Sequence, residues 1–206
     1  MLPTLLGNGG PVIWLILIAA ATAAVVFTER ALFCHRSQIN SAEFLNGVRT
    51  VVKRGNIVEA IAICDATAGP VARLVKAAIL ARDLGRDRVS EAVEEAGLTE
   101  VPRLEEKLNL LATIAQIAPL LGLFGTMVGF ISVFGHVEEK GLYANIEYLS
   151  HGIWQALICG TAGIAVAIPA HAGYNYLVSR VNKIVLDMER AAAEIVNIVT
   201  ENGSGK

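Results

Sequence analysis

The stretch IWQALICGTAGIAVAIPAHAGYN, residues 153–175, contains no Asp, Glu, Lys or Arg and consists mainly of apolar and small side chains. A transmembrane helix needs about 20 consecutive residues of this kind. Residues 108–135 have the same character, and residues 11–27 form a shorter apolar run. The three runs predict an all-α membrane protein with three transmembrane helices, of which the second covers residues 108–135 and the third 152–179.

The composition of the whole chain agrees with this interpretation. Of its 206 residues, 54% are hydrophobic and 17% are charged, whereas a soluble domain carries about 25% charged residues. A cleaved signal peptide is the alternative for the first run. Residues 1–10, however, lack the Lys or Arg that precedes the apolar core of a signal peptide. We therefore expect a retained first helix.

The distribution of Lys and Arg predicts the orientation, because these residues concentrate in cytoplasmic segments. Most of the 17 Lys and Arg residues lie within residues 29–107, and most of the others lie after the third helix. Residues 1–28, which contain the N-terminus and the first helix, are thus predicted to begin outside the cytoplasm. Residues 136–151 are predicted to form an outer loop, and residues 29–107 and 180–206 to form cytoplasmic helical regions.

The cytoplasmic region is expected to consist of short amphipathic helices beginning near residues 41, 56 and 70. Asn56 and Glu59 have the spacing of a capping box, and Gly69-Pro70 is typical of a helix end followed by a helix start. Each of the two long apolar runs is longer than a bilayer requires. About 28 helical residues measure about 42 Å, against a hydrocarbon core of about 30 Å, so both helices are expected to extend into the cytoplasm.

Two threonines are candidates for a polar path through the membrane. Thr126 and Thr161 each lie about nine residues from the outer end of their helix, which is a depth of about 14 Å. Hydroxyls at this depth can relay a proton or orient water, since they both donate and accept hydrogen bonds. The alternative is that each Thr bonds its own helix or holds two helices together.

The two long spans contain no carboxylate. Gln155 near the outer end cannot titrate, and we interpret it, like His171 and Asn175 nearer the cytoplasm, first as an interfacial or packing residue. A membrane-embedded acid costs about 2.5–3.5 kcal/mol on insertion and marks function where it occurs. If the chain serves a proton path, the titrating acid must therefore come from another subunit.

Glycines and prolines indicate how the long helices pack. Gly125 and Gly129 form a small-xxx-small pair, which permits close helix approach. Pro119 and Pro169 are expected to kink their helices, since each leaves a backbone carbonyl without its helical partner. The candidate packing glycines are Gly122, Gly125, Gly129 and Gly163.

Other classes of protein are not supported by the sequence. The three cysteines are scattered, which predicts neither a disulfide framework nor a metal site. There is no phosphate-binding Gly-rich loop, no nucleophile constellation and no basic run. We therefore expect no enzyme activity, no cofactor and no nucleic-acid partner.

Two motifs, APLLGLFGTMVGFISVF (residues 118–134) and QALICGTAGIAVAIPAHAGYN (residues 155–175), resemble the core helices of the ExbB/TolQ/MotA proton-channel family. The resemblance is greatest to the ExbB and TolQ branch. It extends to the three-span topology and to GPVARLVKAAI from Gly69. The flagellar-stator branch is a weaker match, because its members have four spans.

This resemblance implies a homopentamer in the bacterial inner membrane, around a pore that encloses single helices of an ExbD- or TolR-like partner with a membrane Asp. Proton flow would drive the motor, and a TonB- or TolA-like protein would carry the work, as in protein transport by the TonB system. Thr126 matches the pore-lining Thr of the first core helix.

The sequence departs from the family pattern at two points. Some relatives carry Glu where Gln155 stands, so a titrating role does not transfer. The Thr positions of the second core helix align with Cys159 and Gly160, and Thr161 is one residue further, which is a rotation of about 100°. A non-conducting membrane scaffold is the alternative function.

Overall fold

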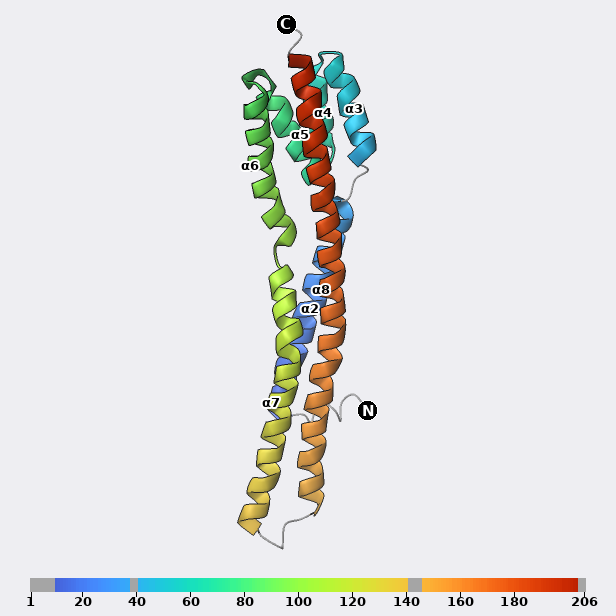
Figure 1. Cartoon of the computed structure of the whole chain (residues 1–206). Helices are drawn as coiled ribbons and strands as arrows, with labels where there is room; N and C mark the ends of the chain where they lie inside the picture. The colour runs from blue at the N-terminus through green and yellow to red at the C-terminus, as the bar shows by residue number, and fades with distance from the viewer. Residues whose placement is uncertain (1–9, 38–40, 141–145, 204–206) are drawn as a thin grey trace. The chain divides into compact units, whose positions relative to one another are not determined.

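The computed structural model describes residues 10–37, 41–140 and 146–203, and no strand occurs among them. Figure 1 shows their helices, three of which are long and apolar enough to cross a membrane. The prediction of an all-α membrane protein is thus confirmed. In chain order the elements are α2 (Gly10–Ser37), α3 (Ser41–Lys53), α4 (Ile57–Ala66), α5 (Pro70–Ala81), the 3-10 turn η1 (Arg82–Leu84), α6 (Arg86–Glu105), α7 (Leu108–Lys140) and α8 (Ile146–Gly203).

The chain divides into two compact units. The first, which we call the membrane unit, comprises residues 1–29 and 107–176, and the second, the polar unit, comprises residues 30–106 and 177–206. The membrane unit therefore contains the described start of α2, all of α7 and the first half of α8. The polar unit contains α3 to α6 and the second half of α8.

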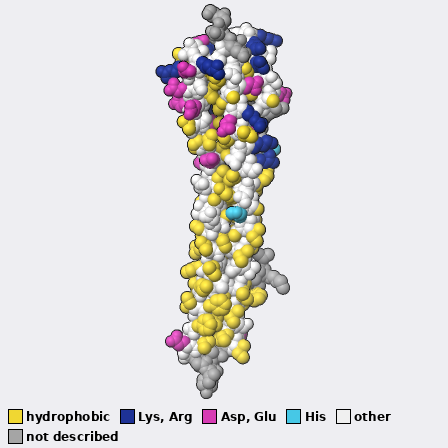
Figure 2. All heavy atoms as spheres, in the orientation of Figure 1, with side chains coloured by type: hydrophobic (Ala, Val, Ile, Leu, Met, Phe, Trp, Pro, Cys, Tyr) yellow, Lys and Arg dark blue, Asp and Glu magenta, His cyan; other side chains and the backbone are white. Residues whose placement is uncertain are grey.

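The membrane unit is held by apolar side chains of α2 that pack on α8. Val12, Ile13 and Ile16 form a buried cluster with Cys159, and Leu121 of α7 packs against it. Large apolar side chains also point outward from α7, among them Phe124, Ile131 and Phe134. Figure 2 shows the hydrophobic side chains that cover the visible face of this unit. Such a surface fits lipid or other transmembrane helices.

The polar unit has α5 in its core. Val75, Ala78 and Ile79 of this helix are almost fully buried, and α5 contacts both α4 and α6. Asn56 caps the start of α4 as expected, because its side chain accepts a hydrogen bond from the backbone N–H of Glu59 at 3.3 Å. The Glu59 carboxylate accepts in return from the side-chain amide of Asn56 at 2.7 Å, rather than from its backbone N–H as in a complete capping box. The three short helices predicted from the sequence are confirmed.

Helix α6 was not among the helices predicted from the sequence. Its buried residues Val89, Val93, Glu100 and Leu104 follow helical spacing, but the charged Glu100 interrupts the apolar stripe that would have indicated a helix. Glu100 is nevertheless buried because Arg73 of α5 and Arg103 pair with it, at 2.5 and 3.1 Å. Ion pairing of this kind makes burial of a carboxylate tolerable.

The two long helices differ in continuity. Residues 106 and 107 separate α6 from α7, and Lys107 has a positive φ of 62°, so the second span is not one unbroken helix with α6. The buried Arg30 holds the end of α6, because it donates to the carbonyl of Arg103 at 3.3 Å and pairs with Glu106 at 3.2 Å. Helix α8 runs unbroken from Ile146 to Gly203. The segment predicted as an outer loop, residues 136–151, is helical at both ends.

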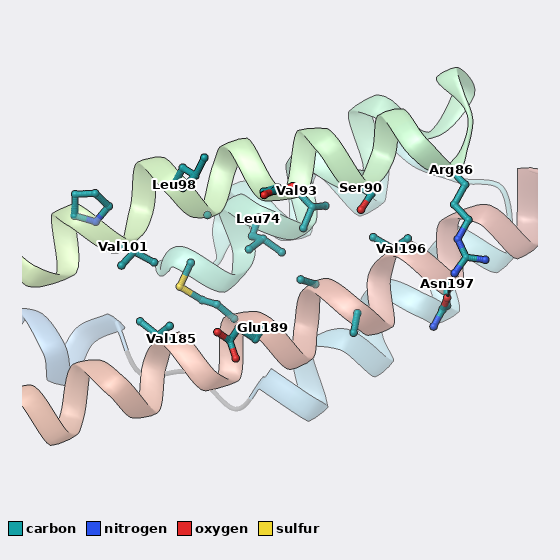
Figure 3. Close-up of a pocket in the computed structure, with 16 residues that line it drawn as sticks. Leu74, Arg86, Ser90, Val93, Leu98, Val101, Val185, Glu189, Val196 and Asn197 are labelled. Atoms are coloured by element: carbon teal, nitrogen blue, oxygen red, sulfur yellow. Dashed lines mark hydrogen bonds between the residues drawn. The ribbon is translucent and has the colours of Figure 1, made fainter.

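A partly open hollow of about 670 Å³ lies between α5, α6 and α8 of the polar unit. Figure 3 shows Leu74, Val93 and Val196 among the side chains that line it. At one end Arg86 donates a hydrogen bond to the side-chain oxygen of Asn197 at 3.3 Å. The hollow is mainly apolar, and it lies in the unit that does not contain the candidate threonines.

Candidate functional site

Helices α7 and α8 of the membrane unit approach each other backbone to backbone. A Cβ atom added at Gly163 would lie 2.6 Å from the carbonyl oxygen of Ala118 and 2.7 Å from the Cα of Gly122. Real Cβ atoms do not approach other atoms so closely. The absence of a side chain at Gly163 is therefore a condition of this contact.

The other candidate glycines lie along the same contact. A Cβ at Gly125 would be 2.6 Å from the Cβ of Cys159, and one at Gly129 would be 2.7 Å from the Cβ of Ala156. Gly125 also faces α2, since its added Cβ would be 3.1 Å from Val12. The structure thus brings Gly122, Gly125, Gly129 and Gly163 together on one helix–helix interface.

Thr126 lies in the middle of this interface. Its hydroxyl donates to the carbonyl of Gly122 in its own helix at 3.0 Å and is 3.1 Å from the carbonyl of Ala156 on α8. The side chain is half-buried. On the facing helix Gly160 leaves room for it, because a Cβ at Gly160 would be 2.8 Å from the Thr126 hydroxyl oxygen.

The chemistry available at Thr126 follows from this geometry. One hydroxyl proton is shared between two carbonyls, which links the two helices. The hydroxyl oxygen can in addition accept a hydrogen bond from water or from another side chain. Thr126 can therefore connect a polar path to the helix interface, but it cannot store a proton.

Thr161 occupies a different position. It is exposed on α8, whereas the α8 residues that meet the Thr126 hydroxyl are Ala156 and Gly160. The structure of this single chain does not bring the two threonines together. The reason is rotational, since the residue after Gly160 is turned by about 100° around the helix.

Gln155 is half-buried beside the start of α2. Its side-chain amide nitrogen occupies the space that a Cβ at Gly10 would need. Gln155 also lines a partly open pocket of about 580 Å³ between α7 and α8, together with Ser132 and Gly152. The residue thus contacts the first helix on one side and a polar pocket on the other.

The prolines lie inside continuous helices, Pro119 in α7 and Pro169 in α8. Pro169 lines another hollow of the membrane unit, of about 440 Å³, together with Phe27 of α2 and Leu111 of α7. Ala165, whose carbonyl would otherwise accept the N–H that Pro169 lacks, lines the same hollow. The exposed His171 and Asn175 follow further along α8.

Sequence reasoning missed several residues of this region. Ala156 contributes only a backbone carbonyl and a small side chain, and Gly160 contributes only the space left by its missing side chain. Neither residue type therefore indicates a functional site in the sequence. His136 and His151 line the pocket beside Gln155, and they could have been found because they are imidazoles at the ends of uncharged runs. Within the described ranges no group of three potential metal ligands occurs, and Cys34, Cys64 and Cys159 are buried and form no disulfide.

Residues 66–190 match the model of the MotA/TolQ/ExbB proton channel family, and this match includes α7, α8 as far as residue 190, and the Thr126 contact. The chain belongs to this family. The resemblance noted from the two motifs is therefore confirmed. The family is described as one of proton channels rather than as a class of enzymes, and the three apolar helices make this member a multi-pass membrane protein.

Three relatives illustrate the similarity. A biopolymer transport ExbB homolog of Methanothermobacter thermautotrophicus is 26% identical over 85% of this chain and 62% of its own length. The Tol-Pal system protein TolQ of Haemophilus influenzae is 36% identical over 52% of this chain and 46% of its own. The biopolymer transport protein ExbB of Neisseria gonorrhoeae is 25% identical over 94% and 90%. The chain thus spans less than two thirds of the length of the first two relatives.

Proposed function

We propose that this family member is the pore-forming subunit of a proton-driven motor in the bacterial inner membrane, which couples proton flow to energised transport at the outer membrane. The observation that carries the proposal is the position of Thr126. Its hydroxyl lies at the close approach of the uncharged spans of α7 and α8 and contacts both of them. Relatives named ExbB and TolQ support the same assignment.

Neither long span contains an acid, so the proposed complex must obtain its membrane carboxylate from elsewhere. The sequence contains no Asp or Glu within residues 108–135 or 152–179. Thr126, Thr161 and Gln155 can pass or orient a proton but cannot hold one. The complex therefore needs a partner that supplies a membrane carboxylate, and we expect a single-span ExbD- or TolR-like protein with a membrane Asp.

The assembly that fits these requirements is a homopentamer around the partner's helices, with a TonB- or TolA-like protein as the recipient of the work. The exposed apolar surface of α7 and α8 supports close packing between copies. The charge distribution supports a periplasmic N-terminus and a cytoplasmic C-terminus.

Co-expression tests the proposal. The chain is produced together with a candidate single-span protein that carries a membrane Asp, and a tag on one of them is used for purification from mild detergent. We expect a stable complex, with five copies of this chain as in the proposed pentamer, whose reconstituted vesicles conduct protons. The absence of both a complex and gradient-dependent proton flux would contradict the proposal.

A TolQ-like role in envelope maintenance is a second candidate, and the TolQ relative's 36% identity favours it. Deletion of the gene separates the two roles. Loss of nutrient uptake with an intact envelope supports the ExbB-like role, and sensitivity to detergents supports the TolQ-like role. A non-conducting scaffold is the third candidate, because the glycine contact and the two Thr126 bonds would also serve packing alone.

A further inference from the structure

One end of the α7–α8 pair carries a polar pocket that the proposed path through Thr126 does not yet include. The pocket measures about 580 Å³ and is partly open. Two imidazoles, a carboxylate, a phenol and an amide line it, which contrasts with the uncharged residues 108–135 and 152–179 of the same two helices. The polar lining residues are Ser132, His136, Glu147, Tyr148, His151 and Gln155.

The pocket is built from both helices. The rings of His136 on α7 and Tyr148 on α8 are stacked, with centroids 4.2 Å apart and an interplanar angle of 11°. Gly152 lies against Val133, whose side chain fills the space that a Cβ at Gly152 would need. The ends of the two helices are therefore held together around the pocket. His151 and Glu147 are exposed, so water reaches the pocket.

The pocket adjoins the Thr126 contact through α8. Gln155 lines the pocket, and the next residue, Ala156, provides the carbonyl that faces the Thr126 hydroxyl at 3.1 Å. On α7, Ser132 lines the pocket as well, six residues along the helix from Thr126. No Asp, Glu or His occurs between this pocket and the level of Thr126 in either helix. The imidazoles are thus the innermost side chains at this end that can both bind and release a proton.

We propose that His136 and His151 form a proton-loading site, which takes protons from the outer solution and delivers them toward Thr126. The inference rests on the proposed function. In the loading step an imidazole nitrogen binds a proton from water and the ring becomes an imidazolium. In the release step the proton passes to pocket water beside Gln155, and the neutral ring is restored, so no other bond changes.

The surrounding charges favour loading. Glu147 and Tyr148 of α8 line the pocket, and Glu138 and Glu139 are exposed just beyond His136 on α7. The described start of α2 lies against Gln155 at Gly10, which has no side chain. Nearby carboxylates attract cations and raise their local concentration. The flux should therefore depend on outer pH through the histidines.

The test uses the complete complex, reconstituted in vesicles, with proton flux followed by a pH-sensitive dye over about pH 5 to 8. The variant His136→Phe/His151→Gln keeps a ring that can stack on Tyr148 but removes both imidazoles. We expect flux to fall about tenfold or more and its dependence on outer pH to flatten. His35→Gln, at an exposed position of the polar unit, is the matched control and should behave as the unaltered complex.

Two results would overturn the inference. In the first, the double variant keeps the pH profile of the unaltered complex while Thr126→Val abolishes flux. This result would contradict the loading site but leave the proposed function intact. In the second, the unaltered complex shows no flux, or Thr126→Val leaves the flux unchanged. Either outcome would contradict both the loading site and the proposed function. If the double variant does not assemble, the single exposed change His151→Gln is used instead, and an unchanged profile there likewise contradicts the role of His151.

Discussion

The α7–α8 contact of the membrane unit and the α5–α6 contact of the polar unit are built on opposite principles. The first has glycines at its closest points, so that backbone meets backbone at Gly122 and Gly163. The second buries large side chains such as Ile79, Val89 and Leu104. Lipid tails are as apolar as the side chains, so helix pairing in a bilayer gains no free energy from the hydrophobic effect. Close packing and hydrogen bonds between the helices must stabilise the pair instead. In water, burial of apolar area itself stabilises, by about 25 cal/mol per Å².

The comparison also explains where polar groups occur inside each unit. In the membrane unit the polar group at the helix contact is the neutral hydroxyl of Thr126, which finds two carbonyls. In the polar unit a full carboxylate, Glu100, is buried because Arg73 and Arg103 pair with it while remaining half-exposed to solvent. A charge is tolerated where charged partners and water are near, whereas backbone carbonyls alone can satisfy a neutral hydroxyl.

The largest effect is expected from Gly163→Ala. The added methyl group would lie 2.6 Å from the backbone oxygen of Ala118, so α7 and α8 must separate and lose the Thr126 bond between them. We expect little folded protein, measured as the monodisperse fraction in detergent by size-exclusion chromatography. Gly135→Ala on α7 is the control, because nothing lies within 4 Å of its added Cβ, and it should stabilise by up to about 1 kcal/mol. Equal yields of the two variants would contradict the close contact.

The next effect concerns the core of the polar unit. Leu104 is 1% exposed, and Leu104→Ala should lower the free energy of unfolding by about 2–5 kcal/mol, because it leaves a cavity. The measurement is thermal or denaturant unfolding followed by circular dichroism. Leu98, on the same helix, is 71% exposed, and Leu98→Ala should change the stability by less than about 0.5 kcal/mol. Similar losses for both would argue against the burial of Leu104.

A smaller effect is expected from the buried carboxylate. Glu100→Gln removes the charge that Arg73 and Arg103 share, and it should cost about 1–3 kcal/mol of unfolding free energy. Glu91→Gln is the matched control, because the Arg88–Glu91 pair is exposed, and such pairs contribute about 0–1 kcal/mol. The same unfolding measurement applies, and a larger loss at Glu91 would reverse the expected order.

The smallest effect under ordinary conditions involves Cys64. Burial raises the pKa of its thiol from 9.0 to about 11, with Asp65 adding to the shift and Lys76 opposing it. The raised pKa favours the neutral thiol in the folded state, so its contribution to stability is complete below pH 9.0 and is lost as pH rises toward about 11. Alkylation by iodoacetamide should therefore be slow at neutral pH and accelerate only above pH 9.0. Rapid labelling of the folded protein at pH 8 would contradict this environment.

The sequence predicts those features that depend on spacing within one segment. The length of the uncharged sequence runs indicated the three apolar helices, and the Asn56–Glu59 spacing indicated the start of α4. It does not predict features that depend on which residue faces another across helices. The Ala156 carbonyl opposite Thr126 and the ring of Tyr148 on His136 arise from tertiary packing. Helix α6 was missed because its stripe contains Glu100, whose partner Arg73 is distant in the sequence.

The position of Thr161 shows the same limit at a single residue. Equal depth suggested that Thr126 and Thr161 could share one space. Depth fixes the level in the membrane but not the direction around the helix, and the facing residue is Gly160. A role for Thr161 therefore remains a proposal that concerns the assembled complex, where its exposed face can meet another chain.

The most direct test of the central claim is proton flux through the reconstituted complex with Thr126→Val. Valine has nearly the shape of threonine but neither donates nor accepts, whereas Thr126→Ser retains the hydroxyl. With assembly verified by size-exclusion chromatography, we predict that Thr126→Val loses flux by about 100-fold and that Thr126→Ser retains most of it. Flux in Thr126→Val equal to that of the unaltered complex would contradict the account.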